Sequence, residues 1–101
     1  MKLPRYELDE SVIISLARKY KIRELSLFGS VLRDDFGEKS DIDILVQFDK
    51  EAELSLFDLF EVQEEFEKAL GRDVDLVEKD GLRNPYRRER ILSTAKVVYA
   101  A

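Results

Sequence analysis

The chain has 101 residues, of which 45% are hydrophobic and 39% charged, with only four glycines and two prolines. This composition is typical of a globular protein, and we expect one domain over residues 1–101. The formal net charge of -5 disfavours a nucleic-acid partner, because polyanions bind basic surfaces. The absence of cysteine and histidine excludes disulfides, thiolate catalysis and the usual zinc ligands, so any catalysis depends on carboxylates, hydroxyls and cations.

The N-terminal stretch MKLPRYELDE contains no apolar run that resembles a signal peptide. No segment approaches the length that spans a bilayer, so we expect no membrane partner. Both observations predict a cytoplasmic protein.

The first half of the chain predicts two helices and two strands. Apolar residues at helical spacing behind Asp9, a good N-cap, predict a helix over residues 10–20. Residues 23–28 predict a strand that ends at Gly29, and residues 30–35 leave room for a short helix. Residues 41–48 alternate between an apolar side and a side that begins with two acids, which predicts a second strand.

The second half predicts a long helix, a strand and a final helix. Ser55 and Asp58 resemble an N-terminal cap, and the helix that follows stops at Gly71. Residues 73–77 alternate and predict a third strand, after which Pro85 begins a helix followed by the short apolar tail VVYA. Helices alternating with strands indicate an α/β fold, in which we expect the helices to pack on the face of a small sheet opposite the acids.

The candidate site consists of acids at strand parity. Asp41 and Asp43 must project from one face of their strand, and Asp73 and Asp75 from one face of theirs. If the two strands are neighbours, three or four carboxylates converge, an arrangement that needs a cation to offset their repulsion. Mg²⁺ prefers oxygen ligands and is the expected cofactor.

Gly29-Ser30 can complete this site by binding phosphate. Glycine lets the backbone approach a phosphate closely, and the following helix start offers free N–H groups and a hydroxyl. Arg33, one turn later, adds a positive charge.

Each feature also has a purely structural interpretation. Gly29-Ser30 can be a simple turn, and Asp73 can be a solvated loop end. The cluster Arg83, Arg87, Arg88 and Arg90 can be an exposed helix face. Leu45 and Phe57 lie off the core faces, and we expect both to be engaged in local packing.

Taken together, these residues resemble the minimal nucleotidyltransferases of the DNA polymerase β superfamily. The resemblance covers residues 22–99 and includes G-S-x-x-R at residues 29–33, D-x-D within SDIDILV, the later V-D-L-V at residues 74–77 and the tail NPYRRERILSTAKVVY. It implies a polymerase β palm-like fold with a mixed sheet and helices mainly on one face. It also implies that Asp41 and Asp43 bind two Mg²⁺ ions, that Asp75 is a metal ligand and base, and that Gly29 and Ser30 hold the β and γ phosphates.

The implied reaction is transfer of a nucleoside monophosphate from a triphosphate, with ATP as the expected donor, to an acceptor hydroxyl. Small members of this family resemble antitoxins that act on a HEPN-type toxin, some of them on a toxin tyrosine. Two alternatives stay open. The protein can be a catalytically silent antitoxin that neutralises its partner by binding alone, or it can transfer nucleotides to RNA or to a small molecule.

Overall fold

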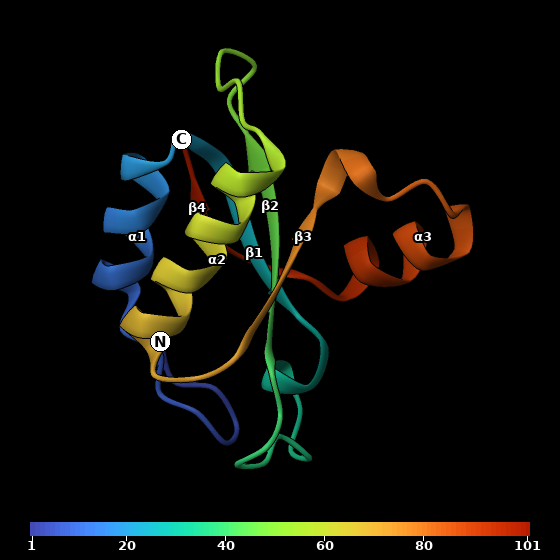
Figure 1. Cartoon of the computed structure of the whole chain (residues 1–101). Helices are drawn as coiled ribbons and strands as arrows, with labels where there is room; N and C mark the ends of the chain where they lie inside the picture. Colours follow the sequence, from blue (N-terminus) through green and yellow to red (C-terminus); the bar gives the residue numbers. More distant parts are fainter.

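The computed structural model describes all 101 residues, and its centre is a four-stranded mixed sheet (Figure 1). The strands stand in the order β3-β2-β1-β4. β1 is antiparallel to both β2 and β4, whereas β2 and β3 are parallel. The bounds are Ile22–Phe28 for β1, Ile42–Phe48 for β2, Val74–Glu78 for β3 and Lys96–Ala100 for β4. The expected α/β class and mixed sheet are therefore confirmed.

Two helices lie side by side on one face of the sheet, α1 (Glu10–Lys19) and α2 (Leu56–Leu70) (Figure 1). Both begin where the sequence predicts. The Asp9 carboxylate accepts a hydrogen bond from a first-turn amide of α1, and Ser55 and Asp58 form a capping box on α2. α2 ends at Gly71, whose φ of 66° is left-handed. No helix in the structure is long and apolar enough to cross a membrane.

The main core lies between these two helices and the sheet. The even-numbered residues of β2 supply its centre, because the alternation of the strand turns all of them toward the helices. Phe66 of α2 is fully buried among them. The fully buried members of this cluster from α1, α2, β1 and β2 are Ile13, Ala17, Leu25, Leu27, Ile42, Ile44, Val46, Val62 and Phe66.

The third helix, α3 (Pro85–Thr94), lies on the other face of the sheet, which is the face that carries the acids (Figure 1). Ile91 packs there with Phe28 and Leu45, and Leu82 completes this second apolar cluster. The expectation that the helices avoid the acid face holds for α1 and α2, whereas α3 is an exception. The physical reason is Leu45, an apolar residue that shares a face with Asp43 and requires cover. Its expected role in local packing is confirmed.

The apolar tail after α3 is a fourth strand, which the sequence analysis did not predict. β4 pairs with β1, so that Leu25 lies opposite Tyr99 and Leu27 opposite Lys96. Only five residues form this edge strand. A segment this short has too little alternation to predict a strand from its sequence, and its pairing with β1 is what identifies it.

Candidate active site

Gly29 brings the end of β1 against the first acidic strand. Its φ of 75° lies in the left-handed region, and a Cβ on this residue would fall 2.1 Å from Oδ2 of Asp43. Glycine is therefore required both by the backbone conformation and by the neighbouring carboxylate. The predicted short helix follows as a single 3-10 turn, η1 (Gly29–Leu32), in which Ser30 is half-buried.

The strand registers bring three of the predicted acids to the same end of the sheet. Phe28, the last residue of β1, lies opposite Asp43, and Asp43 is in turn the β2 partner of Asp75 on β3. Asp41 comes directly before β2. Asp43 is half-buried, whereas Asp41 and Asp75 are exposed. Convergence of the carboxylates requires that the two acidic strands be neighbours, and β2 and β3 are.

Asp73 contributes its backbone to this region. Its carbonyl accepts a 2.9 Å hydrogen bond from the amide of Ile42, which joins the start of β2 to the chain that enters β3. Its carboxylate is exposed and makes no hydrogen bond or ion pair within the chain. This placement agrees with the interpretation of Asp73 as a solvated loop end.

Negative charge accumulates around Asp43. Burial raises the pKa of the Asp43 carboxyl, and the charges of Asp75 and Asp41 raise that pKa further. No basic side chain forms an ion pair with any of the three acids. Uncompensated carboxylate oxygens are the environment that a hard divalent cation prefers.

Carboxylate oxygens are suitable ligands for such a cation, although the three side chains do not converge on one point in this structure. No group of three or more acidic side chains in the structure is close enough to hold a metal ion. Asp41 and Asp75 are exposed, so their side chains have room to rotate toward Asp43.

Two arginines from different elements approach these acids. Arg33, directly after η1, is exposed, and its Nε donates a 3.2 Å hydrogen bond to the carboxylate of Asp35. The positive charges of Arg33 and of Arg87 on α3 both lower the pKa of Asp43 against the stronger opposing effects. The placement of α3 on the acid face therefore brings part of the arginine cluster to the candidate site.

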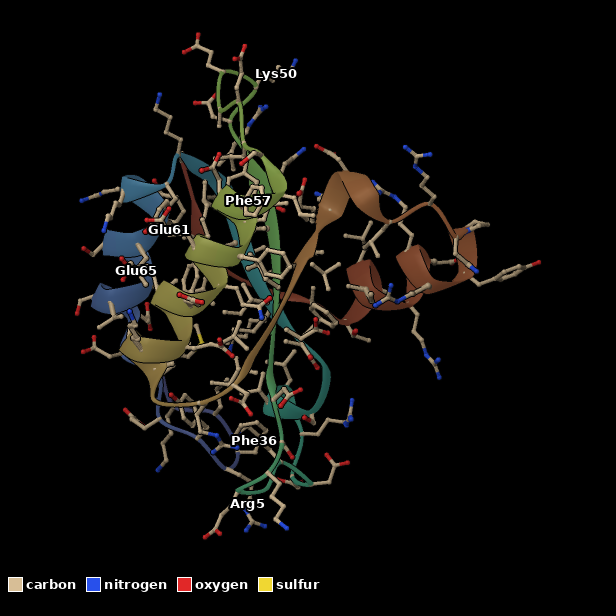
Figure 2. The ribbon with its side chains drawn as sticks, in the orientation of Figure 1. Arg5, Phe36, Lys50, Phe57, Glu61 and Glu65 are labelled. Atoms are coloured by element: carbon tan, nitrogen blue, oxygen red, sulfur yellow. The ribbon has the colours of Figure 1, made fainter.

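Arg72 is a residue whose role the sequence analysis missed. Its guanidinium donates hydrogen bonds to the carbonyls of Gly37 and Ser40, the latter at 2.7 Å, and lies 4.5 Å from the ring centroid of Phe36. These contacts tie the loop before Asp41 to the residue after the end of α2. Figure 2 shows Phe36 at the lower end of the molecule, close to the N-terminal segment that carries Arg5. The contacts join residues more than thirty positions apart, so no local pattern reveals them.

A glycine turn after β1 therefore lies beside acids at the start of β2 and a third acid on the parallel strand β3. The chain belongs to the Nucleotidyltransferase domain family, which matches residues 10–98. It is therefore a nucleotidyltransferase, and the resemblance found in the sequence is confirmed.

Known proteins similar to this chain belong to the same class. One relative, from Methanocaldococcus jannaschii, is classed by name with the protein adenylyltransferases; it is 43% identical over 76 residues, which cover 75% of this chain and 76% of the relative. A chain of a toxin-antitoxin crystal structure with AMP-PNP superposes with a TM-score of 0.77 at 28% identity, over 93% of this chain and 75% of that one. A chain from the complex of tri-AMPylated Shewanella oneidensis HEPN toxin with an MNT antitoxin gives a TM-score of 0.64 at 29% identity, over 91% and 70%.

Proposed function

We propose that this nucleotidyltransferase transfers AMP from ATP to a tyrosine hydroxyl of a partner HEPN-type toxin and thereby acts as its antitoxin. The observation that carries this proposal is the register of Asp43 beside Asp75, next to the close approach of Gly29. The donor is supported by the similar structure with AMP-PNP, and the acceptor by the similar structure with an AMPylated HEPN toxin.

We assign the phosphate groups of the donor to the turn after β1. Gly29 removes the side chain that would keep a phosphate away from the backbone, and Ser30 offers a hydroxyl and an N–H group at the start of η1. Arg33 adds positive charge beside this turn. The β and γ phosphates are assigned to these residues.

The acids are assigned to metal binding and proton transfer. Asp41, Asp43 and Asp75 would hold two Mg²⁺ ions, which when bound neutralise the carboxylates and the charge that develops on the phosphates. Asp75 accepts the proton of the acceptor hydroxyl while the hydroxyl oxygen attacks the α phosphorus. As this P–O bond forms, the bond from the α phosphorus to the bridging oxygen breaks and pyrophosphate leaves with the electron pair.

An exposed apolar surface on α2 supports a protein as the partner. Leu56, Phe57 and Phe60 are 67%, 85% and 57% exposed. The expected local packing of Phe57 is wrong, because its side chain extends into solvent from the first turn of α2 (Figure 2). Clustered large apolar side chains on a surface are typical of a protein-binding site.

A second candidate function, transfer to an RNA end, is favoured by one observation. Arg83, Arg87 and Arg90 are all exposed on or just before α3, on the face of the sheet that carries the acids. The net charge of -5 opposes this function. RNA binding that weakens steeply with salt would support it.

A labelling experiment tests the proposed function. The purified chain is incubated with Mg²⁺, ATP labelled at the α phosphate and the protein that co-purifies with it. We expect label on a tyrosine of that protein, at amounts of nucleotidyltransferase well below stoichiometric. Label that persists with Asp41→Asn/Asp43→Asn would refute the site, and neutralisation only at stoichiometric amounts without ATP would indicate a binding-only antitoxin.

Metal binding has an independent readout. A ligand present at about ten times its Kd stabilises the folded state by about 1.4 kcal/mol. We therefore expect Mg²⁺ to raise the Tm of the wild-type chain and to leave that of Asp41→Asn/Asp43→Asn unchanged. Equal shifts in both proteins would place the bound ion elsewhere.

A further inference from the structure

A cavity of about 290 Å³ lies between η1 and α3, directly beside the Gly29 turn. No acid of the candidate site lines it. The lining residues that matter for its chemistry are Phe28, Gly29, Leu32, Arg33, Arg90 and Ile91.

The floor of this cavity is apolar and firmly held. Phe28 and Ile91 are only 8% and 7% exposed, because both pack into the second apolar cluster with Leu45 and Leu82. Close packing behind these two side chains prevents them from moving away. A flat apolar ring gains from such a floor, whereas phosphate oxygens would find no hydrogen-bond donors on it.

Two arginines line the cavity, and they come from different elements. Arg33 belongs to the segment after η1 and Arg90 belongs to α3, and both are exposed. Arg90 makes no ion pair within the chain. The nearby Thr94 hydroxyl donates to the Arg90 backbone carbonyl at 2.9 Å. Planar guanidinium groups stack readily on aromatic rings.

We propose that this cavity binds the base of the nucleoside triphosphate, with Phe28 and Ile91 beneath the ring and the Arg90 guanidinium against it. Gly29 links the two parts of the site, since it lines the cavity and also begins the turn assigned to the phosphates. The inference rests on the proposed function, because it requires a triphosphate on Gly29 and Ser30.

Two ligands that share the triphosphate and differ in the nucleoside test this assignment. One is a non-hydrolysable ATP analogue, and the other is inorganic tripolyphosphate, which has the phosphates without a nucleoside. Thr94→Trp adds an indole at the exposed rim of the cavity, and Ser93→Trp adds the same group one residue away, outside the lining. Affinities are measured by calorimetry with Mg²⁺ present, after circular dichroism has confirmed that each variant is folded.

Because the added indole fills part of the cavity, we expect Thr94→Trp to weaken binding of the ATP analogue by about tenfold or more and to change tripolyphosphate binding by less than about twofold. Ser93→Trp should change neither. Arg90→Ala, at an exposed position that does not endanger folding, should weaken the analogue more than tripolyphosphate and decides the matter if Thr94→Trp does not fold.

Three results would overturn the inference. If Thr94→Trp, or Arg90→Ala in its place, weakens both ligands equally, the cavity holds phosphates. If the variant leaves analogue binding unchanged but blocks transfer, the cavity serves the acceptor. If analogue binding and transfer are both unchanged, the cavity has no part in the reaction. A binding-only antitoxin gives a different result, because the wild-type chain would then bind neither ligand, and a different acceptor would show in the labelling experiment while both ligands still bind.

Discussion

Gly29→Ala should lower both the stability of the fold and the rate of nucleotidyl transfer, and the two losses have different causes. The loss of stability comes from the backbone conformation of the turn after β1, and the loss of activity from the displaced carboxylate of Asp43. Placing alanine in the left-handed region at φ 75° destabilises the folded state by about 1–2 kcal/mol. Alanine also restricts the unfolded chain, which offsets about 0.4–1 kcal/mol of this loss. The expected net loss is about 1 kcal/mol, which for a chain of this size lowers the Tm by roughly 4–8 °C.

The loss of activity should be much larger than this loss of stability. The new methyl group would fall 2.1 Å from Oδ2 and 3.1 Å from Cγ of Asp43, so the carboxylate must rotate away. A misplacement of about 1 Å in a catalytic constellation reduces rates by about 100-fold. We expect kcat/KM for nucleotidyl transfer to fall by about this factor.

Gly71→Ala is a matched control, because Gly71 has a φ of 66° but no atom within 4 Å of a Cβ on it. It should show a similar decrease in Tm by differential scanning fluorimetry and retain wild-type transfer of label from ATP. If Gly29→Ala transfers label at the same rate as Gly71→Ala, the close approach of Gly29 to Asp43 has no role in the chemistry.

Four further substitutions test the energetics of the fold and the site. The pKa of Asp43 is raised above its ordinary value of 3.8, so the ionised carboxylate destabilises the folded state at higher pH. Asp43→Asn should therefore raise the Tm at pH 7, and the gain should shrink as the pH falls toward 3.8. An unchanged Tm at pH 7 would contradict this prediction. Arg72→Ala should cost about 1–3 kcal/mol and speed amide hydrogen exchange at Ser40, whose unchanged exchange would show that the loop is held otherwise. In urea unfolding, Phe66→Ala should cost about 3–5 kcal/mol and Phe57→Ser less than about 0.5 kcal/mol, and a large loss at Phe57 would mean that its ring is packed in solution.

Local interactions explain what could be predicted about the helices. Asp9 and Ser55 cap amides within one helical turn, and Gly71 ends α2 through its own backbone conformation. These contacts join residues that are neighbours in the chain, so a single segment of sequence contains all the information needed. The same holds for the alternation of β2, which places Asp41 and Asp43 on one face.

Phe57 and β4 show where this reasoning fails. Leu45 and Phe57 are both apolar residues off the main core faces, yet Leu45 is 2% exposed and Phe57 85% exposed. The difference is α3, which covers Leu45 and leaves α2 uncovered on its outer side. β4 likewise becomes a strand only because β1 has a free edge beside it.

The sequence by itself determined the helix ends, the parity of the acids and the glycine-serine turn, because each of these depends on interactions over a few residues. Only the tertiary structure decided that β3 lies parallel to β2 with Asp75 beside Asp43, that Arg72 holds the loop before Asp41, and that α3 packs on the acid face. These contacts join segments about thirty or more residues apart. Their geometry depends on how the whole chain buries its apolar surface, which no local pattern specifies.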